Sequence, residues 1–349
     1  MKQQKLFAWL LTILLLTCGA TAWSAARGTQ TVLQGAPAEA LMSALENSPW
    51  IADGTAADKQ VYIIHSTTCG FCKKFFGDSR ALTSRVQFRW VTHCCIGQGG
   101  EYVVEQHTPA AIADAYAKRT GNAKNMERAK REIEVNMWAT SALPKANNIF
   151  YPTFVYRTTN GVAVSYGAPQ DLNKMVASVA SRPDRANYRP QAQALLDAPI
   201  VMTPAGKLKQ YYNNDRKNTV PMYAQPDKSS QKVVDIAFNY GYPVLGVANK
   251  EWITVPGLIM GGGSQARGYI HAPREIKLAL LDFKVRPASG NVQSKKSTDI
   301  RLHPDMDSPV VDKLEPGYQL RKTGEVSLGG KQWNEVILYN DGTKGYLLQ

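Results

Sequence analysis

The segment Val61–Phe75 reads VYIIHSTTCGFCKKF, and it decides how the N-terminal half of the chain is interpreted. Its first four residues are an uninterrupted apolar run, which is typical of a β-strand buried on both faces. Cys69 and Cys72 follow this run at a spacing of i and i+3, so they share one face of a first helical turn. The segment therefore predicts a strand, a short turn, and a helix that begins at the two cysteines.

The two cysteines form a pair with clear chemistry. At this spacing they can close a disulfide with little movement of the backbone. Free N–H groups and the helix dipole favour a negative charge at Cys69, which lowers the pKa of its thiol. Because the thiolate is the reactive form, we expect Cys69 to attack a disulfide and Cys72 to resolve the mixed disulfide. Gly70 and Phe71 between them would form an exposed lip that contacts a substrate.

Further elements alternate on both sides of this pair. A proline at position 152 precedes an apolar run, and proline is tolerated in a sheet at such a strand entry because it has no N–H to donate. Asn160-Gly161 is a strong signal for a hairpin turn. The expected elements are a helix at 36–46, a strand at 86–91, two or three helices within 101–142, strands at 153–157 and 162–166, and a helix at 169–180.

The CGFC motif and Tyr151-Pro152-Thr153 together resemble the thioredoxin fold, in which a cis-proline loop faces the cysteine pair. With the segments Trp50–Gly54 and Gly167–Pro169, residues 36–182 are similar to the periplasmic disulfide isomerases of the DsbC/DsbG type. This resemblance implies a thiol:disulfide oxidoreductase, an isomerase or reductase of disulfides in exported proteins. It implies Cys69, Cys72 and Pro152 as catalytic residues, Tyr151 and Thr153 as substrate contacts, a membrane thiol reductase as electron donor, and no cofactor.

A second cysteine pair, Cys94-Cys95, follows the strand expected at 86–91. One hypothesis is an auxiliary redox pair that relays its oxidation state to the first pair, and the alternatives are two buried thiols or an intermolecular bridge. With His93 it could also complete a zinc site, but the three adjacent residues lack the usual ligand spacing, and we expect no metal. His65 is either a proton carrier for the first pair or a hydrogen-bonded structural histidine.

The C-terminal half contains an internal repeat of short strands and turns. Pro226-Asp227 matches Pro304-Asp305, and a tryptophan and a Gly-Tyr pair follow in each copy. This pattern resembles bacterial SH3-like domains, which commonly bind cell-wall or protein ligands. Trp252 and Trp333 would then be either ligand contacts or core residues.

The N-terminus and the charge bear on location and partners. Two lysines, an apolar run and a Ser24-Ala25-Ala26 stretch are typical of a cleaved signal peptide, and the alternative is a membrane anchor within residues 6–26. We therefore expect a periplasmic protein. Lys and Arg total 41 against 28 Asp and Glu, a net charge of +13. The excess is spread along the chain, which favours an affinity for anionic surfaces, or solubility alone, over nucleic-acid binding.

The sequence of 349 residues thus predicts a multidomain protein. An α/β thioredoxin-like domain with a helical insertion is followed by two small all-β SH3-like barrels. The expected boundaries are a signal peptide at 1–26, the redox domain at 27–182, a linker at 183–209, and barrels at 210–280 and 281–349. The alternative function is a non-enzymatic envelope adaptor that binds cell wall, or a secretion or conjugation complex, through the barrels.

Overall fold

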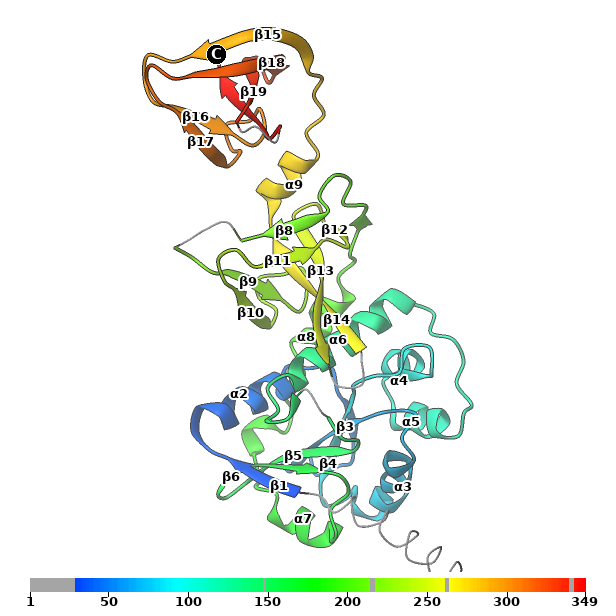
Figure 1. The fold of residues 1–349 in the computed structure, drawn as a ribbon. Coiled ribbons are helices and arrows are strands. Elements are labelled where there is room, and N and C mark those ends of the chain that lie inside the picture. Colours follow the sequence, from blue (N-terminus) through cyan, green and yellow to red (C-terminus); the bar gives the residue numbers. More distant parts are fainter. Residues whose placement is uncertain (1–28, 147–148, 214–216, 261–263, 339–341) are drawn as a thin grey trace, which may run out of the picture. The chain divides into compact units, whose positions relative to one another are not determined.

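The computed structural model describes residues 29–146, 149–213, 217–260, 264–338 and 342–349 (Figure 1). The chain divides into two compact units. The first extends to Ile200 and also includes Val220–Ile236 and Pro256–Tyr269, and the second contains the remaining segments up to Gln349. The expected signal peptide lies outside the described residues. Among the described helices, none has the length and apolar character needed to cross a membrane.

The N-terminal part of the first unit is built on a six-stranded sheet with the strand order β1-β6-β5-β3-β4-β2. Only the neighbours β3 and β4 are parallel, and the other four pairs are antiparallel. The strands are β1 (Thr29–Leu33), β2 (Ile51–Asp53), β3 (Gln60–His65), β4 (Gln87–Thr92), β5 (Thr153–Thr158) and β6 (Gly161–Tyr166).

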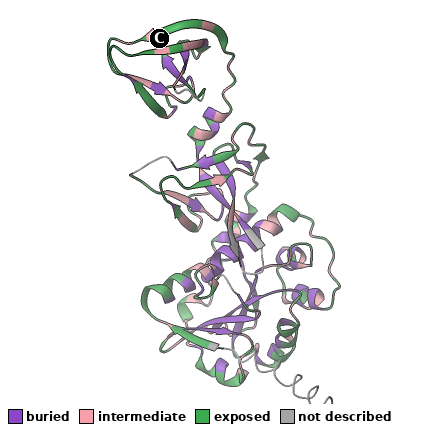
Figure 2. Cartoon of the chain, in the orientation of Figure 1, coloured by how far each residue is buried: buried purple, intermediate pink, exposed green. Residues whose placement is uncertain are grey.

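Strand β3 is buried along its whole length, as its apolar run predicts (Figure 2). Val61 and Ile63 belong to the hydrophobic core on one face of the sheet, and Tyr62 and Ile64 belong to the core on the other. Successive side chains of a strand point to opposite faces, so an uninterrupted apolar run supplies both cores. Each face must therefore be covered by helices.

The helices that cover the sheet lie close to their expected positions. They are α2 (Gly35–Glu46), α3 (Gly70–Asp78), the 3-10 turn η2 (Ser79–Leu82), α4 (Gly100–Gln106), α5 (Pro109–Tyr116), α6 (Met126–Thr140) and α7 (Leu172–Ser178). Helix α7 begins later than the expected residue 169 because Asp171 caps its first turn by accepting a hydrogen bond from Lys174 N.

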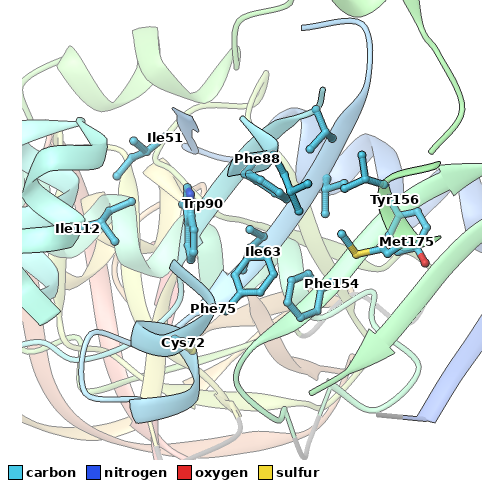
Figure 3. Packing of buried hydrophobic residues seen from close by; sticks show 14 of the residues in the cluster. Ile51, Ile63, Cys72, Phe75, Phe88, Trp90, Ile112, Phe154, Tyr156 and Met175 are labelled. Carbon is cyan, nitrogen blue, oxygen red and sulfur yellow. The ribbon is translucent and has the colours of Figure 1, made fainter. Parts of the chain in front are cut away.

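An aromatic cluster attaches α3 to the sheet. Phe75 of α3 packs against Phe88, Trp90 and Phe154, with ring centroids between 4.7 and 5.9 Å apart (Figure 3). All four side chains are almost completely buried. Aromatic pairs of this kind contribute beyond the area that they bury. The cluster therefore fixes the helix that carries the two cysteines.

After the first sheet, the chain forms short helices and then mainly strands. The segment expected as a linker contains η4 (Pro183–Arg185) and α8 (Ala192–Asp197). Further sheets have the orders β10-β9-β14-β13-β12-β7, β11-β8 and β15-β18-β19-β20-β16-β17. Their members are β7 (Met202–Thr203), β8 (Gln210–Tyr212), β9 (Val220–Tyr223), β10 (Lys232–Ile236), β11 (Gly241–Pro243), β12 (Gly246–Ala248), β13 (Trp252–Met260), β14 (Ser264–His271), α9 (Pro273–Ala279), β15 (Arg286–Gln293), β16 (Thr298–Arg301), β17 (Val310–Leu314), β18 (Gln319–Leu328), β19 (Lys331–Ile337) and β20 (Lys344–Leu348).

The internal repeat appears as two turns with the same hydrogen bonds. In the turn between β9 and β10, Gln225 N donates to Ser230 Oγ (3.2 Å), Asp227 N to Gln225 O (2.8 Å), and Ser230 N to Asp227 O (3.1 Å). The turn between β16 and β17 repeats these bonds at His303 N–Ser308 Oγ (2.8 Å), Asp305 N–His303 O (2.8 Å) and Ser308 N–Asp305 O (3.0 Å). The two copies therefore fold alike locally.

The recurring Gly-Tyr pair also has one structural reason in both copies. A Cβ added at Gly268 would lie 2.3 Å from Met222 Sδ, and one at Gly345 would lie 2.5 Å from Ile300 Cγ2. Gly268 thus lets β14 pass closely over β9, and Gly345 lets β20 pass closely over β16. The recurring tryptophans, Trp252 and Trp333, are buried and belong to the core.

Helix α6 joins the first repeat to the N-terminal sheet within the first unit. Arg267 of β14 donates to Glu134 Oε1 (2.8 Å), and the Trp138 indole N–H donates to Arg267 O (2.9 Å). At Gly257 the backbone of β13 passes so closely that an added Cβ would lie 1.9 Å from Ala266 O and 2.4 Å from the Trp138 ring. Only a glycine fits at this position.

We predict that Gly257→Ala destabilises the protein by about 2 kcal/mol or more. The added methyl group would clash with Ala266 O and the Trp138 ring, so the backbone or that ring would have to shift. The measurement is the free energy of unfolding by chemical denaturation. Gly121→Ala is the matched control, since an added Cβ there meets no atom within 4 Å. Equal stability of the two variants would contradict this packing.

Candidate functional site

The cysteine pair lies where β3 ends and α3 begins. After His65 the chain turns through Ser66, whose carbonyl accepts a hydrogen bond from Cys69 N (3.2 Å). Cys69 is the N-cap of α3, and its sulfur accepts from Cys72 N at 3.2 Å. The side chain of Cys69 is half-buried and that of Cys72 is fully buried. Only Cys69 is therefore open to a reactant.

A proline loop closes over the pair from the neighbouring strand. The peptide bond between Tyr151 and Pro152 is cis, and Thr153 begins β5 in register with Ile64 of β3. This pairing brings the loop to the end of β3, where the Cys69 thiol donates to Tyr151 O at 3.4 Å. The structure thus brings Cys69, Cys72 and the Tyr151–Thr153 segment together.

The two thiols have opposite acidities. Hydrogen bonding between the two cysteine side chains, with help from the backbone N–H groups of Phe71 and Cys72, lowers the pKa of Cys69 to about 6. Burial raises the pKa of Cys72 well above its usual range. At neutral pH the site therefore holds an accessible Cys69 thiolate beside the buried Cys72 thiol. The Cys69 thiolate can act as a nucleophile.

The surroundings of Cys69 are an exposed lip and a cleft. The side chain of Phe71 is 63% exposed, and Gly70 is exposed beside it. A cleft of about 470 Å³ lies next to Cys69 and Gly70, and its lining includes Lys73 and Lys118. An apolar side chain and two cations therefore border the thiol.

Two buried histidines lie beneath this site. His65 uses both ring nitrogens, which lie 2.9 Å from Tyr116 Oη and 3.0 Å from Thr92 Oγ1. Burial, and to a smaller extent His93, lowers the pKa of His65 to about 3, so the ring is neutral. With both nitrogens engaged in the interior, His65 matches the description of a hydrogen-bonded structural histidine.

His93 is a contact of the site that the sequence did not indicate. Its Nδ1 lies 2.5 Å from Tyr151 Oη, and burial lowers its pKa to about 4. Through Tyr151 it supports the loop that contacts Cys69. The position of His93 directly after β4 could have indicated this contact. Because β3 and β4 are parallel, their carboxyl ends lie at one edge of the sheet.

Cys94 and Cys95 are joined by a disulfide at the same edge of the sheet. Cys95 Sγ lies 3.0 Å from Ser66 Oγ, in the turn that leads to Cys69. A relay between the two pairs remains a hypothesis. The disulfide leaves neither sulfur as a thiolate ligand for zinc, and the described residues contain no group of three or more potential metal ligands.

The comparisons with known proteins find matches among solved structures. No protein-family model and no curated protein matches the chain. Among solved structures, Ly7917 matches at 15% identity over 43% of this chain and 60% of its own, with a TM-score of 0.17. Ly7917 with the hydrolyzing product of MDP matches at 12% identity over 49% and 71%, with a TM-score of 0.18. NlpC2 from Trichomonas vaginalis matches at 15% identity over 40% and 45%, with a TM-score of 0.15.

These matches correct the assignment made from the sequence. The solved structures named above are Ly7917 and NlpC2, not disulfide isomerases of the DsbC/DsbG type, so the family assignment was wrong. That assignment also implied the activity of a thiol:disulfide oxidoreductase or disulfide isomerase, and this prediction was wrong for the same reason. The physical reason is that a four-residue motif and one proline specify a local geometry, and function does not follow from such a motif alone. TM-scores this low transfer no activity from the matched proteins to this chain.

We predict that the reduced protein reacts with iodoacetamide at Cys69 with a midpoint near pH 6, because the thiolate is the reacting species. Cys72 should stay unmodified in the folded protein, since it is buried. Peptide mass spectrometry across a pH series measures both sites separately. Cys72→Ala should move the midpoint upward. A midpoint near pH 8.5, the ordinary value for cysteine, would contradict this electrostatic account.

Proposed function

We propose that this protein is a periplasmic envelope adaptor that binds the cell wall through its C-terminal repeats. In this proposal residues 27–182 form a thioredoxin-like domain, and the two copies of the repeat are SH3-like barrels. The parallel β3–β4 pair and the cis-proline loop opposite Cys69 support the first part. The matching turns of the two copies support the second part.

The observation that carries the proposal is a pocket of about 610 Å³ in the second compact unit. Segments before β8, helix α9 and strand β20 all contribute to its lining. Helix α9 is held beside the turn of the second copy by ion pairs from Lys277 to Asp307 (2.8 Å) and Asp305 (3.5 Å). The volume is in the range of sites for small ligands.

The lining combines charged and apolar side chains, and its charged members include Lys207, Lys209, Lys344 and the acidic Glu275. Lys207 and Lys209 border the pocket, and neither forms an ion pair with any residue that the structure describes. Phe283 and Leu278 contribute apolar surface. Burial lowers the pKa of His303, so this lining residue is neutral at pH 7, and the third lining lysine, Lys344, is paired with Glu335 at 2.9 Å.

Lys207 and Lys209 outnumber the one acidic lining residue, Glu275, so the lining favours a ligand that carries a carboxylate next to apolar groups. The cross-linking peptides of the cell wall have that chemistry, since they combine free carboxylates with methyl side chains. Lysine ammonium groups pair with such carboxylates at a partly exposed site, where added salt weakens the attraction. The pocket therefore favours a cell-wall peptide as the bound group.

We predict that the full chain co-sediments with purified peptidoglycan sacculi and that binding weakens as salt is added. Lys207→Glu/Lys209→Glu should weaken it by about tenfold or more, which corresponds to roughly 1.4 kcal/mol. Lys295→Glu/Lys313→Glu changes the net charge equally and lies outside the pocket, so it is the matched control. The absence of sedimentation, or equal loss in both variants, would contradict the proposal.

A further inference from the structure

The pocket of the second unit has one acidic lining residue, Glu275, which the proposed binding of a carboxylate does not use. Glu275 is partly exposed and lies on α9. Leu278 and Ala279 also line the pocket, and residues at this i, i+3 and i+4 spacing share one face of a helix. Another side of α9 contacts the turn of the second copy, where Lys277 pairs with Asp307 at 2.8 Å. Glu275 therefore lies on the helix face that borders the pocket.

Tyr211 of β8 gives a second indication of where the Glu275 carboxylate lies. The Tyr211 side chain lines the same pocket and is 6% exposed. Burial, and to a smaller extent the negative charge of Glu275, raises the pKa of Tyr211 well above its usual range. Because the energy between two charges falls with their distance, the carboxylate lies near the Tyr211 hydroxyl. The negative charge of Glu275 is therefore placed at the wall of the pocket.

Positive charge borders the same pocket from the segment before β8. Lys207 and Lys209 are both exposed lining residues. Burial lowers the pKa of His303, Asp305 raises it, and Lys207 lowers it, which places the Lys207 ammonium group near the second repeat copy. Among the residues that the structure describes, neither lysine forms an ion pair with Glu275 or with another acidic group, and Glu275 has no other cationic partner. Charges of both signs are therefore available to a ligand.

This arrangement limits the charge of the ligand. A ligand that carries only carboxylates is attracted by the lysines and repelled by Glu275, whereas a ligand with an ammonium group and a carboxylate is attracted by both. The attraction is strengthened where the ligand displaces water from the pocket, because the effective dielectric constant falls. The turn of the first copy borders a separate cleft of about 450 Å³, and no acidic residue lines that cleft. The combination of charges is therefore a property of the pocket in the second unit.

We propose that this pocket selects cell-wall peptides that are not cross-linked, with Glu275 pairing with their free ammonium group and Lys207 and Lys209 with their carboxylate. Peptide cross-links of the cell wall are amide bonds, and forming one converts an ammonium group into an uncharged amide. A cross-linked peptide therefore keeps carboxylates for the lysines and presents no cation to Glu275. This selectivity rests on the proposed binding of the cell wall and adds the state of the peptide that is bound.

The test is calorimetric titration of the full chain with N-acetyl-Ala-Lys-Ala and with the same peptide acetylated on its lysine amine. Both peptides have one carboxylate, and only the first has an ammonium group. We expect acetylation to weaken binding to the wild type by about fivefold or more. A third peptide, dimethylated on the same amine, keeps the charge and adds bulk, so it should bind the wild type like the first.

Glu275→Gln tests the carboxylate directly, because glutamine has the same size and no charge. This variant should bind the first two peptides with equal affinity. Glu315→Gln, the matched control, removes the same charge at an exposed residue outside the pocket and should discriminate between them like the wild type. Three results would overturn the proposal: no binding of N-acetyl-Ala-Lys-Ala, equal wild-type affinity for the two peptides, or unchanged discrimination in Glu275→Gln.

Sedimentation with sacculi measures the proposed function separately. Sedimentation of the wild type together with equal affinity for the two peptides would overturn the selectivity alone. Absence of sedimentation would overturn the binding of the cell wall, and the selectivity with it.

Discussion

Helix α6 carries buried charged side chains that must all find partners, and the arrangement of the first unit depends on this constraint. Glu134 pairs with Arg267 of the first repeat, and Arg131 pairs with Gln225 in its turn. Burying a charge without a partner costs several kcal/mol, so these contacts are obligatory once the helix is covered. They explain why two segments of the first repeat copy, Val220–Ile236 and Pro256–Tyr269, belong to the same compact unit as the N-terminal sheet. They also place Gln225 where its amide is held fixed.

Much of the N-terminal fold could be predicted from local patterns. The apolar run of β3 indicated a strand that feeds two cores, and the CGFC motif indicated a helix start, because both signals act within a few residues. Strands β1 and β2 were not predicted. Each is short, and each is held by pairing with a distant strand instead of by its own sequence.

Most of the features that could not be predicted from the sequence are contacts between side chains that lie far apart along the chain. The bond from His93 to Tyr151 joins residues 58 positions apart, and the ion pair from Glu134 to Arg267 joins residues 133 apart. No local period marks such pairs. The repeat could be recognised in the sequence because its turn requires a Pro-Asp pair and the close approach of its strands requires the glycine of the Gly-Tyr pair. The cavities beside the two turns could not be recognised, because each is lined by different neighbouring residues. The family assignment failed for a related reason, since a short motif defines a thiol geometry and leaves its use open.

The Cys69 thiolate and the pocket of the second unit are two separate chemical features, and we assign the function to the pocket. The most direct measurement compares envelope retention of the wild-type chain and a Cys69→Ala/Cys72→Ala variant after cell fractionation, with Cys72→Ala examined for trapped mixed disulfides. We expect equal retention of the two chains with the cell wall and no mixed disulfides. Loss of retention in the double variant, or abundant adducts through Cys69, would contradict it.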